Sequence, residues 1–325
     1  MTVAVTGGTG VVGTAVVRHL LESGAEVRAL ARNDDAMAAL RELGATPVRG
    51  DVLDETSLET LVTRCETVFH VAGVNEMCSR DPARMWRVNV EGALSVLEAC
   101  TRAGARRLVH TSSAVTMGEP AGTVATEATP HRGHFLSEYE RSKTEAERIL
   151  LGTGRDVEVV AVNPSSVQGP GRSTGTGALL LAAARRRFPF AVDATFSLVD
   201  IDDCARGHLL AATEGAPGER YLLSAGVITV REAVSTIRRH LGHPGGPLYL
   251  SPRLVSMLAP LVGAASAALG RHPPLCAESA RVLRHGHRYD GSRAGRELGL
   301  SYRPVTETLT RTVDWFVGEG LLGPD

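Results

Sequence analysis

The chain has 325 residues, of which 43% are hydrophobic and 4% aromatic, enough to bury one large core and a smaller second one. Its 35 basic and 36 acidic residues give a net charge of -1, which excludes the strong positive field of a protein that gathers nucleic acid or an anionic membrane. We therefore expect a globular protein whose partner is a small molecule, with no nucleic acid partner.

Apolar runs rich in strand-forming residues alternate with segments of helical period through the first half of the chain. Strands are predicted at residues 3–6, 26–31, 46–49, 67–71, 107–111 and 157–162. The clearest helices are predicted at residues 11–22, before Gly24, and as one long segment at residues 81–102, before Gly104. This alternation indicates the α/β class and a Rossmann-type doubly wound parallel sheet.

The pattern changes after residue 163, where a loop rich in glycine, threonine and serine is predicted through residue 177. We take residues 1–163 as a Rossmann domain, which residues 197–224 partly rejoin through strands at 197–201 and 221–224. Residues 164–196 and 225–325 are then expected to form a smaller, discontinuous C-terminal substrate domain.

Residues 254–269 are nearly all apolar, although Pro260 interrupts them. The run is shorter than the ~20 residues that a bilayer-spanning helix needs. We therefore expect a helix that lines an apolar pocket of the second domain. Attachment to a membrane is the alternative, which the length disfavours.

The cysteines lie at positions 65, 78, 100, 204 and 276; they form no C-x-x-C pair and are odd in number. This pattern predicts scattered reduced thiols, with neither a disulfide framework nor a metal site. The first residues lack the basic flank and the cleavage site of a secretory signal. Together these features predict a cytoplasmic protein.

The first chemical motif is a glycine-rich turn between a predicted strand and a predicted helix. It reads Thr-Gly-Gly-Thr-Gly-Val-Val-Gly and includes Gly7, Gly10, Val11, Val12 and Gly13. Glycines let the backbone approach a pyrophosphate, and the helix N-terminus supplies amide donors and partial positive charge. The order of strand, glycines and helix therefore predicts a site for a nicotinamide dinucleotide.

The turn after the second strand predicts which dinucleotide is bound. An acidic residue normally holds the free ribose 2′-hydroxyl of NAD there, but this chain has Arg28 and Arg32 instead, and an arginine can bind a 2′-phosphate. NADP is therefore the expected cofactor of residues 1–163, and NAD is the alternative if both arginines are only surface charges. After the third strand, Asp51, next to Val52, is expected either to accept a hydrogen bond from the adenine amino group or to cap a turn.

The second motif joins Ser112 and Ser113, which close a strand, to Tyr139 and Lys143 in a later helix. Residues at i and i+4 share a helix face. At ~4 Å and an effective dielectric of ~20, an ammonium attracts a phenolate by about 4 kcal/mol, or roughly 3 pKa units. We therefore expect Lys143 to bring the pKa of Tyr139 towards neutrality, with a serine hydroxyl steadying a carbonyl oxygen.

These motifs resemble those of the extended short-chain dehydrogenases/reductases, the group of nucleotide-sugar epimerases and dehydratases, 3β-hydroxysteroid dehydrogenases and dihydroflavonol reductases. The resemblance covers almost the whole chain. It rests on Thr6 to Gly13, Gly50-Asp51, His70 to Gly73, Asn89 to Gly92, Thr111 to Ala114, Tyr139-x-x-x-Lys143, Asn163 to Gly171 and Val199 to Asp203.

The resemblance implies a role for each matching residue. Ser113 would be the catalytic serine, Tyr139 the acid/base, Lys143 its activator and a ribose ligand, and Asn89 a polar residue that supports the site. The remaining cofactor contacts implied are Val71, Ala72, Gly73 and Thr111 near the ribose and pyrophosphate, and Pro164, Ser165 and Val167 near the nicotinamide.

Departures from the family pattern indicate the branch. After Ser113 this chain continues Ala-Val-Thr, whereas sugar-nucleotide dehydratases have a Thr-Asp-Glu arrangement after the serine strand. Phe196 occupies the position at which epimerases commonly have an arginine that binds the nucleotide diphosphate. The second strand is similar to the dihydroflavonol reductase type. We therefore expect an NADP(H)-dependent oxidoreductase that interconverts a ketone and a secondary alcohol.

Three questions stay open at this stage. Phe188, Phe190, Phe196 and residues 254–269 suggest a largely apolar substrate, although all of them are equally compatible with a core. A sugar epimerase or dehydratase with retained NAD is the alternative enzyme, and a non-catalytic nicotinamide-sensing protein is a third reading. The resemblance also implies a homodimer packed through two helices of the first domain.

Overall fold

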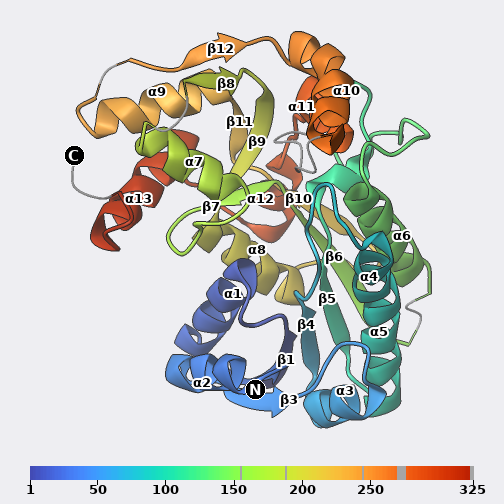
Figure 1. Cartoon of the computed structure of the whole chain (residues 1–325). Coiled ribbons are helices and arrows are strands. Elements are labelled where there is room, and N and C mark those ends of the chain that lie inside the picture. The colour runs from blue at the N-terminus through green and yellow to red at the C-terminus, as the bar shows by residue number, and fades with distance from the viewer. Residues whose placement is uncertain (154–155, 187–188, 244, 269–275, 323–325) are drawn as a thin grey trace.

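The computed structural model describes residues 1–153, 156–186, 189–243, 245–268 and 276–322. Its centre is a parallel sheet in which the described strands follow the order β10-β6-β5-β4-β1-β2-β3 (Figure 1). These strands are β1 (Thr2–Thr6), β2 (Glu26–Ala31), β3 (Thr46–Arg49), β4 (Thr67–His70), β5 (Arg107–Thr111), β6 (Glu158–Pro164) and β10 (Arg220–Leu223). The strand order reverses between β1 and β4, which in such sheets marks the ligand-binding edge.

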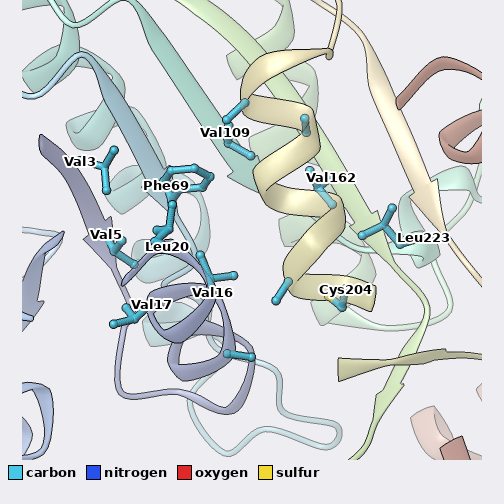
Figure 2. Packing of buried hydrophobic residues seen from close by; sticks show 14 of the residues in the cluster. Val3, Val5, Val16, Val17, Leu20, Phe69, Val109, Val162, Cys204 and Leu223 are labelled. Atoms are coloured by element: carbon cyan, nitrogen blue, oxygen red, sulfur yellow. The ribbon is translucent and has the colours of Figure 1, made fainter. Parts of the chain in front are cut away.

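Helices cover both faces of this sheet because alternate strand residues point to opposite sides. Val3 and Val5 belong to one buried cluster, which Figure 2 shows together with residues of α1 (Val11–Glu22) and α8 (Ile201–Thr213). Ala4 belongs to the other buried cluster, against α3 (Glu55–Val62), α5 (Gly92–Ala103) and α6 (Glu138–Thr153). The predicted doubly wound fold is confirmed.

Most predicted boundaries in the first half agree with the structure to within two residues. Asn33 and Gly44 cap α2 (Asp34–Leu43), with Gly44 in the left-handed conformation. The long helix predicted at 81–102 is instead α4 (Pro82–Trp86), a π-helical turn η1 (Arg87–Glu91) and α5. Apolar periodicity does not show a π turn, because one wide turn leaves the helix continuous.

The smaller part of the structure has its own short sheets. Among the described residues, β7 (Ser166–Gln168), β9 (Thr195–Asp200) and β11 (Gly226–Thr229) form one sheet, and β8 (Phe190–Val192) pairs with β12 (Leu248–Leu250). The prediction that residues 197–201 rejoin the main sheet is therefore wrong, because β9 pairs with β7 and β11. Residues 164–177, expected as a loop, contain β7.

The other described helices are η2 (Ala114–Met117), a 3-10 helix, α7 (Thr176–Ala184), α9 (Val230–His240), α10 (Pro252–Ala268), α11 (Ala277–His285), α12 (Ser292–Leu298) and α13 (Val305–Gly318). Thr229 and Glu232 form a reciprocal capping box at the start of α9. No helix within the described ranges is both long enough and apolar enough to cross a membrane.

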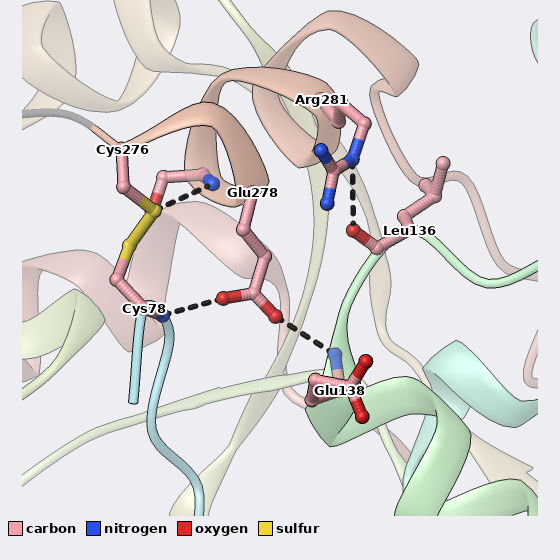
Figure 3. Close-up of a disulfide and its surroundings, with 7 residues drawn as sticks. Cys78, Leu136, Glu138, Cys276, Glu278 and Arg281 are labelled. Carbon is pink, nitrogen blue, oxygen red and sulfur yellow. Dashed lines mark hydrogen bonds between the residues drawn. A yellow bond between two sulfur atoms is a disulfide. The ribbon is translucent and has the colours of Figure 1, made fainter. Parts of the chain in front are cut away.

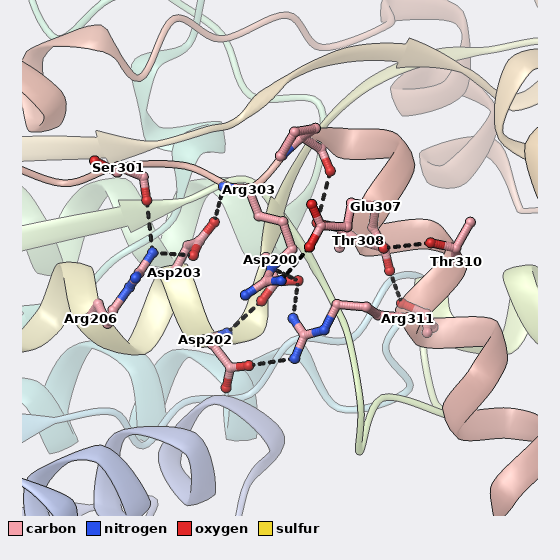
Figure 4. Close-up of polar contacts among 12 residues, drawn as sticks. Asp200, Asp202, Asp203, Arg206, Ser301, Arg303, Glu307, Thr308, Thr310 and Arg311 are labelled. Carbon is pink, nitrogen blue, oxygen red and sulfur yellow. Dashed lines mark hydrogen bonds and ion pairs between the residues drawn. The ribbon is translucent and has the colours of Figure 1, made fainter.

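A partly buried charge network at the start of α8 joins the two parts of the structure (Figure 4). Asp200 is fully buried and caps α8 by accepting from the backbone nitrogen of Asp202 at 2.9 Å. Arg311 of α13 bridges both carboxylates at 2.8 Å, and Arg18 of α1 also pairs with Asp202. The Val199 to Asp203 motif therefore fixes α13 against the sheet helices α1 and α8.

The structure contains a disulfide that the spacing of the cysteines did not predict. Cys78, in the loop after β4, bonds to Cys276 at the start of α11, with a Cα–Cα distance of 6.2 Å (Figure 3). The expectation of only reduced thiols is wrong for this pair, since residues 198 apart in sequence become neighbours through the fold. Cys65, Cys100 and Cys204 are free and buried.

Candidate active site

Two glycines of the turn after β1 are required by the packing of the protein itself. Gly7 has a φ of 72°, and a Cβ on it would lie 2.5 Å from the backbone nitrogen of Ala72. A Cβ on Gly13, in the first turn of α1, would lie 2.0 Å from the carbonyl oxygen of Gly7. These close approaches bring the turn against the chain that leaves β4.

Gly10 is different, because it is exposed and few protein atoms lie near it. A Cβ there would meet, among the described residues, only the Gly7 carbonyl oxygen at 3.3 Å. Gly10 begins α1, which has no side-chain cap and no acidic residue in its first turn within the described chain. Val11 and Val12 are half-buried against the core. Uncapped amides beside an open glycine surface fit the pyrophosphate of a dinucleotide.

The two arginines predicted to bind a 2′-phosphate lie in different places. Arg28, inside β2, donates at 2.8 Å to the carbonyl oxygen of Thr63 and also to that of Thr60, at the C-terminus of α3. That end of α3 lies at the opposite edge of the sheet from the glycine turn, so the prediction of a cofactor contact for Arg28 is wrong. Arg32 follows β2 directly at the correct edge and is exposed.

Asp51 follows β3 at the same edge of the sheet. Its Oδ1 accepts a hydrogen bond from the backbone nitrogen of Leu53 at 3.1 Å, which is the turn-capping role. Val52 is buried against Gly92 of α5, where a Cβ would lie 2.8 Å from the Val52 Cγ2. The contact of Asp51 with adenine stays a prediction.

The chain after β4, which contains Val71, Ala72 and Gly73, lies between the glycine turn and α6. The backbone nitrogen of Ala72 donates to the Thr6 hydroxyl at 3.3 Å. A Cβ on Gly73 would lie 3.3 Å from Asn89 Oδ1 and 3.4 Å from Lys143 Nζ. Gly73 therefore leaves room for both polar side chains at this edge.

Asn89 is buried in the π-helical turn and uses its amide group to hold the backbone. Its Oδ1 accepts from the Val74 nitrogen at 2.7 Å, and its Nδ2 donates at 2.9 Å to both the Val74 oxygen and the Ser142 hydroxyl. Asn89 therefore has a positioning role, because these bonds fix the chain after β4 against α6. π turns are frequent at such functional positions.

Ser113, Tyr139 and Lys143 come together where β5 ends and α6 begins. Ser113 follows β5 and is 8% exposed. Its side chain is close enough to the Tyr139 phenol to lower the pKa of that phenol. Tyr139 and Lys143 occupy consecutive turns of one face of α6. The three predicted catalytic side chains thus share one edge of the sheet with the glycine turn.

Lys143 is 4% exposed and directs its ammonium to the protein backbone. Its Nζ donates to the carbonyl oxygen of Thr111 at 2.7 Å. Burial lowers the pKa of Lys143 to about 8, although the carboxylate of Glu147 acts in the opposite direction. Lys143 is also the only lysine of the chain. The site therefore holds an amine that can lose its proton in mildly alkaline conditions.

The pKa of Tyr139 departs from the expectation. Burial raises it above its ordinary value of 10, whereas the Ser113 hydrogen bond and the positive charge of Arg172 lower it in part. Because Lys143 turns to the Thr111 carbonyl, the phenolate gains less from the ammonium than the helix spacing suggests. Burial therefore favours the protonated form of the Tyr139 phenol.

The remaining predicted contacts border the same edge. The Thr111 hydroxyl forms a hydrogen bond with His208 Nε2 at 2.9 Å. The carbonyl oxygen of Thr111 accepts the hydrogen bond from Lys143. Pro164 ends β6. The backbone nitrogen of Ser165 donates a hydrogen bond to the carbonyl oxygen of Leu223 at 2.9 Å. The Ser165 hydroxyl has no partner among the described atoms. Val167 is buried in β7.

Two residues that the sequence reasoning missed belong to the site. Glu147 is buried one turn after Lys143 and pairs with Arg220 at 3.0 Å. Its spacing, i+4 from Lys143 and i+8 from Tyr139, is the signal that could have identified it. Arg172 lies in the loop after β7, and its Nε is buried without a partner within the described part of the chain.

The side chains expected to form an apolar substrate pocket differ in exposure. Phe190 is 54% exposed, and Phe196 packs against the core of the smaller part. Phe188 lies outside the described residues. In α10, Leu254, Met257, Leu258 and Leu261 are exposed, whereas Val255 is half-buried. Side chains 262–268 and residues 269–275 are outside the description.

Comparison with known proteins agrees with this arrangement. The chain is 33% identical over 99% of its length to sterol demethylase protein B of Methylococcus capsulatus, of which it covers 100%. It is also 33% identical, over 97% of its length, to a Synechocystis protein provisionally named dihydroflavonol 4-reductase, of which it covers 94%. The crystal structure of gox2253 superposes with a TM-score of 0.87 at 29% identity and 98% coverage of both chains.

The match to a family model extends over most of the chain. The model of the NAD dependent epimerase/dehydratase family covers residues 3–224, from β1 to the end of β10. This range contains the glycine turn and the Ser113, Tyr139 and Lys143 cluster. The chain therefore belongs to the NAD-dependent epimerase/dehydratase family of extended short-chain dehydrogenases/reductases, whose members are NAD(P)-dependent reductases, epimerases and dehydratases.

Proposed function

We propose that this protein is an NADP(H)-dependent oxidoreductase that interconverts a ketone and a secondary alcohol on a largely apolar small molecule. The observation that carries the proposal is the pair formed by Ser113 and Tyr139 where β5 ends and α6 begins. It lies beside Lys143, which in turn stands against Gly73 at the cofactor edge of the sheet. A proton donor and a second hydroxyl therefore face the position where a substrate carbonyl would meet the nicotinamide.

The residues have separate roles in this chemistry. The bound nicotinamide supplies or accepts a hydride. During reduction, the Tyr139 phenol gives its proton to the carbonyl oxygen, and the Ser113 hydroxyl donates a hydrogen bond to the same oxygen. The Lys143 ammonium, held by the Thr111 carbonyl, stabilises the phenolate that remains. In the reverse direction, the phenolate removes the proton of the alcohol.

The preference for NADP rests on the turn after β2. Arg32 is exposed at the cofactor edge of the sheet, and Asn33, which follows it, is the N-cap of α2. No carboxylate stands at either position to bind a ribose 2′-hydroxyl. This arrangement supports a 2′-phosphate on Arg32 alone, with NAD as the alternative.

The substrate class rests on the relatives. One is named for sterols and another for a dihydroflavonol, both polycyclic molecules. The residues of this chain add one departure from the dehydratases, since Ala114, Val115 and Thr116 provide no extra carboxylate after Ser113. These features support reduction of a cyclic ketone over dehydration of a sugar.

The test is a screen of the full chain with NADPH and NADH against sterol, flavonoid and sugar-derived ketones, followed by the absorbance of the reduced nicotinamide. We expect NADPH consumption with a polycyclic ketone. Tyr139→Phe should reduce kcat by about 100-fold or more while NADPH still binds. Tyr249→Phe, which removes a remote hydroxyl, is the matched control. Undiminished turnover in Tyr139→Phe would contradict the mechanism, and NAD that stays bound through purification would favour epimerisation.

A further inference from the structure

Three metal-ligating side chains outside the proposed catalytic cluster converge on one point. The Glu119 carboxylate Oε1 lies 3.2 Å from His285 Nε2 and 2.7 Å from His287 Nδ1. The ligand atoms of all three residues lie within 4.8 Å of one another. Glu119 is 1% exposed, and the imidazoles are 6% and 11% exposed. The group is therefore enclosed by protein and is not a surface cluster.

Distant parts of the chain build this arrangement. Glu119 follows η2, the short helix after β5, whereas His285 is the last residue of α11. Gly286 has a φ of 68°, a left-handed conformation that ends α11 and turns the chain. This turn lets two histidines separated by one residue face the same carboxylate.

The carboxylate has an unused, buried oxygen. Glu119 Oε2 has no hydrogen-bond partner among the described atoms, although it is fully enclosed. An unpartnered carboxylate oxygen in the protein interior costs free energy unless a cation or a donor reaches it. This orphaned oxygen is the second observation that points to a ligand here.

The charge of the neighbourhood suits a cation. The nearest guanidinium, Arg132, donates to the Glu119 backbone oxygen at 3.3 Å, but its charge is paired with the buried carboxylate of Glu140. The charges of Arg132 and Glu140 cancel. When both imidazoles are neutral, Glu119 therefore leaves the group with one net negative charge. A divalent cation would reverse the sign of that charge.

We propose that Glu119, His285 and His287 bind a divalent transition-metal cation of the Zn²⁺ type. Two imidazoles and one carboxylate are a ligand set that zinc uses in proteins. Ligand atoms about 2.1 Å from a tetrahedral zinc stand about 3.4 Å apart. This is more than the 3.2 Å and 2.7 Å between Glu119 Oε1 and the two imidazole nitrogens. A small outward movement of the side chains would admit the ion. The fourth position would face the Tyr289 phenol, which lies 2.8 Å from His287 Nδ1.

The ion would join the two parts of the structure beside the catalytic tyrosine. It would link the segment after β5 to the end of α11, whose start is already held by the disulfide. Tyr289 is also close enough to Tyr139 for their charges to interact. The proposal concerns a structural ion and holds whether or not the proposed reductase activity is found.

The full-length, oxidised protein is first stripped of metal with a chelator and dialysed. Zn²⁺ is then added, and its binding is measured. We expect one Zn²⁺ per chain in elemental analysis and a higher unfolding temperature with Zn²⁺. Glu119→Gln keeps the shape of the side chain and should weaken Zn²⁺ binding by roughly tenfold or more; His285→Asn with His287→Asn should weaken it by roughly 100-fold or more. His134→Asn, an exposed histidine of the same region, is the matched control.

Cobalt spectra then identify the ligands. Co²⁺ bound by nitrogen and oxygen gives weak visible bands without the intense charge transfer of a thiolate, so the Cys78 and Cys276 region is distinguished from the proposed site. Wild-type protein that takes up no stoichiometric Zn²⁺ would overturn the proposal. Equal uptake by the folded Glu119→Gln and double-histidine variants, or a thiolate band, would also overturn it.

Discussion

The ammonium of Lys143 donates a hydrogen bond to the carbonyl oxygen of Thr111 at 2.7 Å, and no other lysine occurs in the chain. All other residues counted among the lysines and arginines are arginines, whose guanidinium stays charged at all relevant pH values. A buried ammonium can lose its proton, whereas a buried guanidinium cannot. The one position that keeps lysine is thus the one where proton chemistry is expected.

The lone lysine allows a direct measurement of its pKa. Burial lowers the pKa of Lys143 to about 8 from its ordinary value of 10.5. Protein labelled only in lysine should give one side-chain NMR signal, whose shift with pH has its midpoint near 8. Lys143→Met should remove that signal, and a midpoint near 10.5 would contradict the predicted effect of burial.

The same shift predicts how stability depends on pH. Between about pH 8 and 10.5 the folded amine binds fewer protons than the unfolded one, so stability should rise with pH across this window. Lys143→Met removes a burial cost of about 3 kcal/mol at pH 7, offset by about 1 kcal/mol for the lost hydrogen bond to Thr111. We expect the variant to unfold at a higher temperature at pH 7 and to be inactive. Equal pH dependence of both unfolding temperatures would contradict this account.

Arg172 should control the pH profile of the reaction. Its positive charge lowers the pKa of Tyr139, which burial raises. Arg172→Gln should therefore move the limb of the alcohol-oxidation profile that reports the phenolate to higher pH, while Arg172→Lys restores it. The measurement is kcat/KM against pH for the three proteins. A profile that does not move in Arg172→Gln would show that the charge does not reach the phenol.

Arg32 and Arg28 provide a matched pair for cofactor preference. Arg32→Ala should lower kcat/KM for NADPH by roughly tenfold or more, the value of a charge-assisted contact, and leave NADH almost unchanged. Arg28→Ala should leave the ratio of kcat/KM for NADPH to kcat/KM for NADH unchanged, because Arg28 is hydrogen-bonded to the carbonyl oxygens of Thr60 and Thr63. A loss of NADPH preference in Arg28→Ala, but not in Arg32→Ala, would reverse the assignment.

The disulfide should contribute to stability through the long loop that it closes. Cys78 and Cys276 are 198 residues apart, so their bond restricts the unfolded chain strongly. Replacing both by serine should reduce the free energy of unfolding by about 2–5 kcal/mol. Thermal unfolding with and without reductant tests this: the reductant should lower the unfolding temperature of the wild type only. An equal response of both proteins would contradict it.

Local sequence pattern predicted most strands of the main sheet and the shared helix face of Tyr139 and Lys143. The alternation of Val3, Ala4 and Val5 places successive side chains in opposite cores, as the strand period requires. Tyr139 and Lys143 share a helix face for the same kind of reason, since their spacing matches the helical repeat. In both cases neighbours in sequence determine the geometry.

The failures concern contacts between distant segments. Arg28 and Arg32 are alike in sequence, but only the fold shows that Thr60 and Thr63 bind Arg28 at the wrong edge of the sheet. The Cys78 partner is equally invisible without the fold. The pKa of Tyr139 was misjudged because the calculation included the ammonium and left out burial, which is the larger effect here.

Helix α11 contacts the Rossmann part of the structure at its start, in its middle and at its end. Glu278 accepts from the backbone nitrogens of Cys78 and Glu138 at one end, and Arg281 donates to the Leu136 carbonyl in the middle (Figure 3). At the other end, His285 contacts Glu119. Any hinge motion that parts the two halves here must break all of these contacts together. The proton donor would thus be aligned before a substrate arrives, and the barrier would owe little to reorganisation of the protein.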